Sequence, residues 1–98
     1  MTQSVFIRVA NWNALRYDRV YDHKLACDLL NEEYREWLEA GANEVDSLDA
    51  LCDCIFVSYG ILWKMNVHSD TINNLIPHAV EAAEHYANVP YFSRAVGS

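Results

Sequence analysis

The sequence predicts an all-α fold, a helical bundle of about four helices that is completed by oligomerisation. The 98-residue chain is 52% hydrophobic and has only three Gly and two Pro. That hydrophobic content excludes a disordered chain, and so few turn-forming residues do not suit a fold of many short strands. Apolar residues also recur at helical spacing. Because a chain this short buries only roughly 60–65% of its unfolded surface, we expect one domain over residues 1–98.

The first half of the chain predicts two helices. The first covers about residues 4–15, where the apolar positions at helical spacing are Val5, Phe6, Val9, Trp12 and Leu15. We expect it to lie across the bundle. Residues 16–22 show no sustained period and are interpreted as a connection. The second helix runs from about residue 22 to residue 40, with Asp22 as its N-cap and Gly41 as its C-terminal cap.

The second half predicts two more helices. The third runs from about residue 48 to residue 66, and Asp46 or Ser47 is expected to cap its N-terminus. The fourth runs from about residue 70 to residue 88. Pro77 falls inside this fourth pattern, where it either kinks the helix or marks its true start in the first turn.

The charge balance excludes one class of partner. Seven basic and fourteen acidic side chains give a formal net charge of −7. Proteins that bind DNA or RNA non-specifically use Lys and Arg to neutralise phosphates, so a nucleic-acid polymer is not expected as a partner. The longest uncharged apolar run covers residues 54–63, about half of the roughly 20 residues that a membrane helix needs. We therefore expect no membrane association.

The N-terminal residues and the cysteines predict a cytoplasmic protein. No basic region followed by an apolar stretch opens the chain, because Arg8 interrupts the only candidate for a secretory signal. Cys27, Cys52 and Cys54 are odd in number and form no Cys-x-x-Cys pair. We expect them to be reduced and buried, and we predict neither a disulfide nor a zinc site.

Two carboxylates lie on the apolar face of the second predicted helix. On a wheel of about 100° per residue, Leu25 and Leu29 define this face, and Glu33 and Glu36 fall inside it, with Glu32 just off its edge. An isolated buried carboxylate costs several kcal/mol even after relaxation. These two groups must therefore be protonated, paired with a cation or bound to a metal.

The third predicted helix is apolar nearly all round, except for one stripe. This stripe contains Asp46, Asp49, Asp53, Gly60 and Lys64. If the second and third helices pack antiparallel, as their short connection indicates, Glu33 and Glu36 face Asp49 and Asp53.

Four carboxylates in one pocket repel one another unless divalent ions neutralise them, and a single lysine, Lys64, is too little. Oxygen ligands without His or Cys favour a hard cation, and Mg²⁺ typically binds a few carboxylates together with water and phosphates. The sequence therefore predicts Mg²⁺, with Mn²⁺ as its substitute, and a phosphorylated substrate.

The acidic motifs resemble those of a known enzyme family. Residues 32–36 read EEYRE, residues 49–53 read DALCD, and residues 55–60 read IFVSYG. Over about residues 25–66 the chain is similar to the MazG-like all-α nucleoside triphosphate pyrophosphohydrolases, which include dimeric dUTPases and phosphoribosyl-ATP pyrophosphohydrolases. These carry Glu-Glu-x-x-Glu on one helix and Glu-x-x-Asp on the next. The core motif region here is residues 22–66.

The resemblance implies an activity and a set of site residues. Such enzymes cleave a (d)NTP between its α and β phosphates, releasing the monophosphate and pyrophosphate, a nucleotide house-cleaning reaction. By resemblance, Glu33 and Glu36 are magnesium ligands, Asp53 matches the last residue of the second motif, and Glu32 is a ligand or the base that activates water. Family members work as dimers or tetramers.

The chain departs from the family pattern at one position. The glutamate expected three residues before Asp53 is Ala50, and the nearest carboxylate is Asp49, which is rotated by about 100° and is one methylene shorter. Asp49 is therefore an auxiliary ligand at best. The alternative function is a catalytically weak or inactive helical module that binds a nucleotide or a protein partner.

The sequence also predicts an oligomer and the places of the aromatic side chains. A helix that is apolar on all sides needs neighbours on all sides, so we predict a homodimer or homotetramer. The aromatic side chains Trp12, Tyr59 and Trp63 are expected in the core or in an interface. Trp37, which follows Glu36, is the aromatic candidate for substrate binding. Lys64 is the candidate for a phosphate contact, because the fourth helix offers no Asn-x-x-Lys match.

Overall fold

The computed structural model describes residues 4–85 of the chain. Within them the chain forms four helices and no strand, and the helices are α1 (Val5–Ala14), α2 (His23–Ala40), α3 (Glu44–Lys64) and α4 (Ser69–His85). The all-α prediction is confirmed. None of these helices combines the length and the apolar character that crossing a membrane requires.

The chain divides into two compact units, one up to Val67 and one from His68 onward, and each is described by itself. The first unit holds α1, α2 and α3. The second unit contributes α4. The single domain expected over residues 1–98 stays a prediction.

The caps of the first two helices follow from local sequence. The Ser4 hydroxyl accepts a hydrogen bond from the Ile7 N–H (3.2 Å), and the Asp22 carboxylate accepts one from the Leu25 N–H (3.1 Å). Each satisfies one of the amide groups that have no partner in a first helical turn. Gly41, at φ +55°, ends α2 in a conformation that favours glycine. The predicted caps Asp22 and Gly41 are confirmed.

Helix α3 begins four residues earlier than predicted, and neither Asp46 nor Ser47 is its cap. The N-cap is Asn43, whose side-chain carbonyl accepts from the Asp46 N–H at 3.0 Å. Asparagine caps a helix as well as aspartate or serine does. Glu44 and Asp46 then lie in the first turn, where the helix dipole favours negative charge.

Helix α4 has Pro77 in its interior rather than in its first turn. The chain is already helical at Ser69, and the ring of His68 accepts a hydrogen bond from the Asp70 N–H at 3.1 Å. Of the two interpretations of Pro77, the one that placed the true start of the helix at this residue is wrong. A proline has no N–H, so one backbone bond inside the helix is missing. The predicted end near residue 88 lies outside the described residues.

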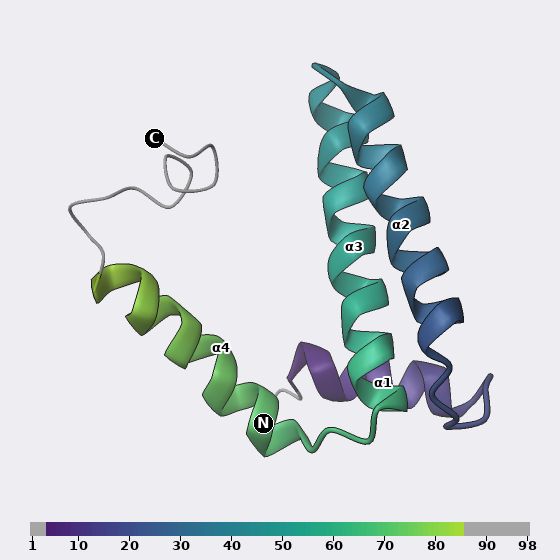
Figure 1. Ribbon diagram of the computed structural model, residues 1–98, viewed down its shortest axis with the longest axis vertical. Helices are drawn as coiled ribbons and strands as arrows, with labels where there is room; N and C mark the ends of the chain where they lie inside the picture. Colours follow the sequence, from purple (N-terminus) through teal and green to yellow (C-terminus); the bar gives the residue numbers. More distant parts are fainter. Residues whose placement is uncertain (1–3, 86–98) are drawn as a thin grey trace. The chain divides into compact units, whose positions relative to one another are not determined.

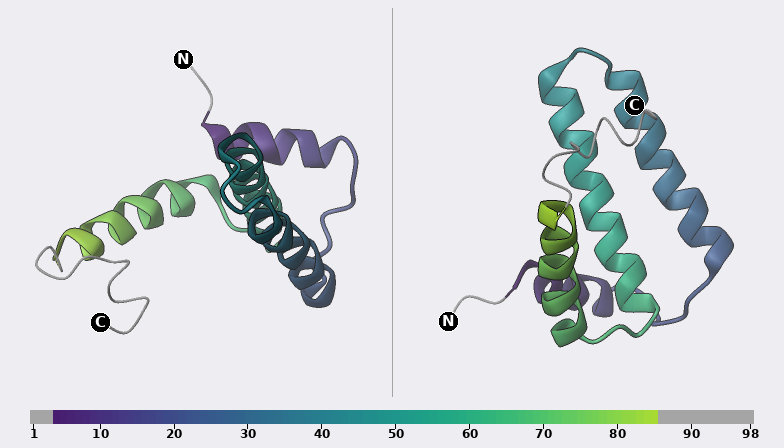
Figure 2. Two further views of the ribbon diagram at one scale, coloured as in Figure 1. Left: turned by 90° about the horizontal axis from the view of Figure 1, so that it is seen from above. Right: turned by 60° about the vertical axis from the view of Figure 1, so that its left-hand side comes forward.

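In the first unit, α2 and α3 form an antiparallel hairpin with a short connection at one end (Figures 1 and 2). The predicted antiparallel packing is confirmed. Helix α1 runs across the hairpin near the C-terminal end of α3, as expected (Figure 1). The Phe6 and Tyr59 rings pack edge to face at 5.7 Å between centroids, and those of Trp12 and Phe56 do so at 5.2 Å. These contacts hold α1 to α3.

A single arginine fastens the connection between α1 and α2 to the end of α3. The Arg19 Nε donates a hydrogen bond of 2.7 Å to the Trp63 carbonyl, and its guanidinium lies 5.3 Å from the centre of the Trp63 ring. The last carbonyls of a helix have no partner within the helix, so a cation that donates to one of them is favourable. This contact fixes the path of residues 15–22.

The hairpin leaves much apolar surface uncovered within one chain. Trp63 and Ala50 are buried, but many large apolar side chains of α2 and α3 are exposed, among them Leu30, Leu38, Leu48, Leu51 and Ile55. The three cysteines are free, as predicted. The expectation that they are buried is wrong for Cys27 and Cys52, because the apolar faces are wider than the area over which the two helices cover each other.

The corrected start of α3 can be tested by removing its cap. We expect Asn43→Ala to lower the free energy of unfolding by about 1 kcal/mol, because the Asp46 N–H loses its acceptor. Urea denaturation measures this change. Ser47→Ala is the matched control and should change stability by less than about 0.5 kcal/mol. If Ser47→Ala lowered the free energy of unfolding more than Asn43→Ala does, Ser47 and not Asn43 would be the N-cap of α3.

Candidate metal centre and the adjoining pocket

Three carboxylates from α2 and α3 lie close together. Glu33 and Asp53 are half-buried and Glu36 is exposed, so the expectation that both glutamates point into the interior is wrong for Glu36. One oxygen from each of Glu33, Glu36 and Asp53 lies within 4.8 Å of the other two. Glu33 and Glu36 are three residues apart, so they share one face of α2. The antiparallel packing of α3 places Asp53 opposite them. The centre therefore depends on two helices and not on one acidic stretch.

Glu33 lies in the least favourable environment of the three. Its side chain is half-buried, and its Oε2 is a buried atom with no hydrogen-bond partner among the residues that the structure describes. Loss of solvent raises the pKa of Glu33 above its ordinary value, and the close approach of the Glu36 carboxylate and the negative charges of Asp53 and Glu32 raise it further. Proton uptake is therefore favoured here when no other cation is present.

The same three carboxylates also affect the thiol of Cys54. Burial raises the pKa of Cys54, and the negative charges of Glu33, Asp53 and Glu36 raise it further. A fourth negative charge next to the three carboxylates would cost still more, so Cys54 stays a neutral thiol. The ligand set at this point of the hairpin therefore consists of oxygen atoms.

These residues fit a hard divalent cation. The buried Glu33 Oε2 has no donor in the described part of the chain, so it is available as a ligand. Two further carboxylate oxygens lie within reach of the same point. Oxygen-only ligation suits Mg²⁺ or Mn²⁺ and does not favour zinc, which prefers nitrogen and sulfur.

Two predicted site residues lie beside this group and not within it. Asp49 is exposed and borders a shallow pocket of about 290 Å³ together with Glu36 and Asp46. Glu32 is exposed and borders a second pocket of about 460 Å³ with Glu36 and Arg35. The structure thus brings together three of the four carboxylates that were expected to share a pocket. Asp49 is exposed because it lies about 100° round α3 from Ala50, the residue of this turn that is buried.

Ala50 occupies the position from which a fourth carboxylate would reach the centre. It is only 4% exposed and borders the same shallow pocket as Glu36. It also lies three residues before Asp53, on the inner face of α3. At this point the inner face of α3 therefore carries a methyl group and no carboxylate.

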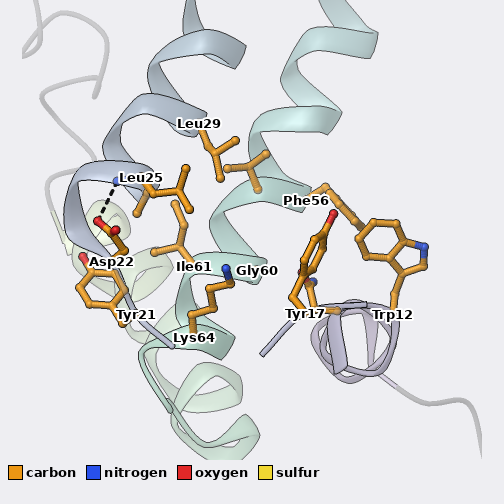
Figure 3. A pocket seen from close by; sticks show the side chains of 13 residues that line it. Trp12, Tyr17, Tyr21, Asp22, Leu25, Leu29, Phe56, Gly60, Ile61 and Lys64 are labelled. Atoms are coloured by element: carbon orange, nitrogen blue, oxygen red, sulfur yellow. Dashed lines mark hydrogen bonds between the residues drawn. The ribbon is translucent and has the colours of Figure 1, made fainter. Parts of the chain in front are cut away.

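A third pocket, of about 370 Å³, lies between α2, α3 and the connection after α1 (Figure 3). Apolar residues of α2 and α3 form two of its sides, and the connection after α1 forms another. Its lining residues are Trp12, Asn13, Tyr17, Tyr21, Asp22, Leu25, Ala26, Leu29, Phe56, Val57, Gly60, Ile61 and Lys64. Such a volume lies within the range of roughly 300–1,000 Å³ that is typical of small-molecule sites.

The two substrate-binding candidates differ in their positions. Lys64 lines the pocket, and its Nζ lies 5.4 Å from the centre of the Tyr17 ring. Trp37 is not among the residues that line it; 38% of Trp37 is exposed and its ring lies 6.2 Å from that of Tyr34. The aromatic residues that do line the pocket include Trp12, Tyr17 and Tyr21. The density of aromatic residues in the connection at 16–22 is the sequence signal that could have identified the last two.

Comparison with known proteins identifies a family for most of this unit. The sequence model of a family described as phosphoribosyl-ATP pyrophosphohydrolase matches residues 13–79, about two thirds of the chain. The match includes the three carboxylates and every residue of the pocket except Trp12. No curated protein and no solved structure gives a significant match.

The raised pKa of Glu33 predicts how metal-free stability depends on pH. Between the unfolded and folded pKa values of this group the folded state holds more protons, so the free energy of unfolding falls as pH rises through that window. We expect Glu33→Gln to flatten this fall. Urea denaturation with chelator present, at pH values from about 4 to 8, measures it. The exposed Glu81 gives the control, Glu81→Gln. A fall as steep in Glu33→Gln as in the parent protein would contradict the assignment.

Proposed function

Because this chain belongs to the phosphoribosyl-ATP pyrophosphohydrolase family, we propose that it hydrolyses a nucleoside triphosphate between the α and β phosphates. The products are the nucleoside monophosphate and pyrophosphate. The family consists of pyrophosphohydrolases, enzymes that act on phosphoric anhydrides. The observation that carries the proposal is the group of three carboxylates on α2 and α3, within which Glu33 has a buried oxygen without a donor.

In this proposal Glu33, Glu36 and Asp53 hold Mg²⁺, or Mn²⁺ in its place. The bound ion supplies neutralising charge for the phosphates and polarises a phosphoryl oxygen. Asp49, exposed one turn from Asp53, is an auxiliary acidic group. Glu32 lies next to Glu33 at the solvent side of α2, where it accepts a proton from the attacking water or serves as a further ligand.

The proposal includes the assembly and location of the protein. The exposed apolar side chains of α2 and α3, such as Leu48 and Ile55, support a homodimer or homotetramer in which they are covered. Free cysteines fit a reducing compartment, which favours the cytoplasm. The formal charge of −7 favours a single nucleotide as the substrate over a nucleic-acid polymer.

A pyrophosphate-release assay tests the activity. Purified protein is incubated with a panel of canonical and modified nucleoside triphosphates and Mg²⁺, and we expect pyrophosphate from at least one of them and none with chelator. Glu36→Gln should release none and should lose the Mg²⁺-dependent rise in melting temperature, because one ligand is missing. Without metal this variant should be at least as stable as the parent protein, since a repulsive charge is gone. Activity without Mg²⁺ in the parent protein would contradict the proposal.

Ala50 supports a second candidate, a helical module that binds a nucleotide but hydrolyses it weakly or not at all. The two candidates are separated by Ala50→Glu, which places a carboxylate on the inner face of α3 beside Glu36 and Asp53. We expect this variant to bind Mg²⁺ roughly tenfold more tightly, about 1.4 kcal/mol, and to release pyrophosphate faster. Leu51→Glu, at an exposed neighbouring position, is the matched control. Activity in Ala50→Glu and none in the parent protein would favour the binding module.

A further inference from the structure

We propose that Cys27 is a nucleophilic thiol that exchanges with low-molecular-weight disulfides, with His23 as its base and Tyr21 as the residue that orients His23. These three side chains lie at the N-terminal end of α2, where the helix follows the connection after α1. Cys27 is six residues before Glu33, roughly 9 Å along the helix at 1.5 Å per residue. The inference therefore concerns a second site and does not rest on the proposed hydrolysis.

Cys27 and His23 are neighbours on the surface of α2. They are four residues apart, so their side chains share one face of the helix. The Cys27 Sγ lies 3.5 Å from the His23 Nε2, and both residues are exposed. A thiol in contact with an imidazole nitrogen can pass its proton to that nitrogen and then attack an electrophile as the thiolate. His23 is therefore placed to act as the base for Cys27.

Tyr21 holds the other nitrogen of the histidine ring. Its hydroxyl lies 2.6 Å from the His23 Nδ1, and the two rings meet edge to face with 6.0 Å between their centres. When Nε2 takes up the thiol proton, both ring nitrogens carry hydrogen, and Nδ1 donates to the Tyr21 oxygen. A nucleophile, a base and a third group that orients the base form the arrangement by which weak nucleophiles are activated.

Tyr21 does not belong to the helix that carries the other two residues. It lies in the connection before α2, and Figure 3 shows it beside Asp22 with its ring at the pocket of about 370 Å³. Its hydroxyl therefore reaches the histidine from a separate segment of the chain. The arrangement depends on the fold of the connection and does not follow from helical spacing alone.

The charged groups around Cys27 leave room for a thiolate. On α2, Asp28 follows Cys27 directly, but its carboxylate is paired with the ammonium group of Lys24 at 2.7 Å. Asp22 is engaged at the end of the helix, where it accepts from the Leu25 N–H. The nearest acid is thus neutralised by a cation one turn away, so little repulsion opposes a negative charge on the Cys27 sulfur.

The other two cysteines lack such partners. Cys52 is also exposed, but the residues four positions before and after it are Leu48 and Phe56, neither of which can take a proton. Cys54 is half-buried beside three carboxylates, whose charges together with burial raise its pKa. Cys52 therefore serves as the matched exposed thiol without a base, and Cys54 as the thiol that the fold protects.

The proposed reaction is a thiol–disulfide exchange. Cys27 passes its proton to the His23 Nε2, and its sulfur attacks one sulfur of a small disulfide R–S–S–R. A new S–S bond forms on Cys27 while the S–S bond of the reagent breaks. The departing thiolate takes the proton from His23 and leaves as R–SH. Cys27 is oxidised to a mixed disulfide and the departing half is reduced, so the reaction needs no further oxidant.

The three cysteines can be compared within the same molecule. The full chain is treated at about pH 7 with limiting iodoacetamide or, separately, with glutathione disulfide, and peptide mass spectrometry follows each cysteine. An ordinary thiol is only a few per cent thiolate at this pH, so we expect Cys27 to react at least about tenfold faster than Cys52 with both reagents. A reducing agent should remove the glutathione adduct. Equal rates at Cys27 and Cys52, or a faster Cys52, would overturn the inference.

A histidine variant tests the base. His23→Gln should slow Cys27 to about the rate of Cys52 and leave Cys52 unchanged. His78→Gln makes the same change at an exposed position on α4 and should leave the rate at Cys27 as it is. Slow alkylation of Cys54 shows that each variant is folded. A rate at Cys27 that stays high in His23→Gln would overturn the inference.

A tyrosine variant and the pH dependence test how the base is held. Tyr21→Phe keeps the ring and removes the hydroxyl, so Cys27 should react more slowly than in the parent protein but faster than in His23→Gln. In the parent protein the rate at Cys27 should rise between about pH 5 and 8, the range in which histidine titrates, and this rise should be lost in His23→Gln. An unchanged rate in Tyr21→Phe, or the same pH profile in His23→Gln, would contradict the roles assigned to these residues.

Discussion

The register of the α2–α3 hairpin is the constraint on which the site depends. Each residue turns a helix by about 100°, so a shift of one residue in α3 would move Asp53 off the face that meets Glu33 and Glu36. Three residues, 41–43, connect the helices: Gly41 ends α2 with a positive φ, and Asn43 caps α3. Because α2 and α3 are stiff, this short turn fixes the relative positions of Glu33, Glu36 and Asp53 further along the two helices.

The metal-free hairpin carries a destabilising feature in its interior. Glu33 loses solvent and gains three negative neighbours, and the resulting rise of its pKa means that its charged form opposes folding at neutral pH. Natural proteins tolerate such groups where function requires them, because a ligand that binds the folded state returns the stability. The charged form of Glu33 thus acts against the fold, and under the proposed function a bound cation would offset that cost.

Sequence patterns predicted the helices and the inner carboxylates, because both follow from a period of 3.6 residues. The wheel that placed Glu33, Glu36 and Asp53 on facing sides needed only the antiparallel packing of neighbouring helices. The wheel also placed Asp49 in this group, but Asp49 is exposed, because the buried residue of that turn is Ala50, about 100° further round α3. The pocket was beyond such reasoning: its Tyr17 wall depends on the path of the 15–22 connection. The hydrogen bond from Arg19 to the Trp63 carbonyl fixes that path. These two residues are 44 apart in the sequence, so no short periodic pattern of apolar residues predicts their contact.

That same separation has a consequence for the order in which the site forms. The hairpin closes through a three-residue turn, whereas attaching α1 and the 15–22 connection requires the Arg19 contact to close a loop of 44 residues. Loop-closure entropy makes the second event slower than the first. A nascent hairpin can therefore bring its three carboxylates together while the aromatic wall formed by Tyr17 is still absent, so the acidic centre forms before the pocket of about 370 Å³ does.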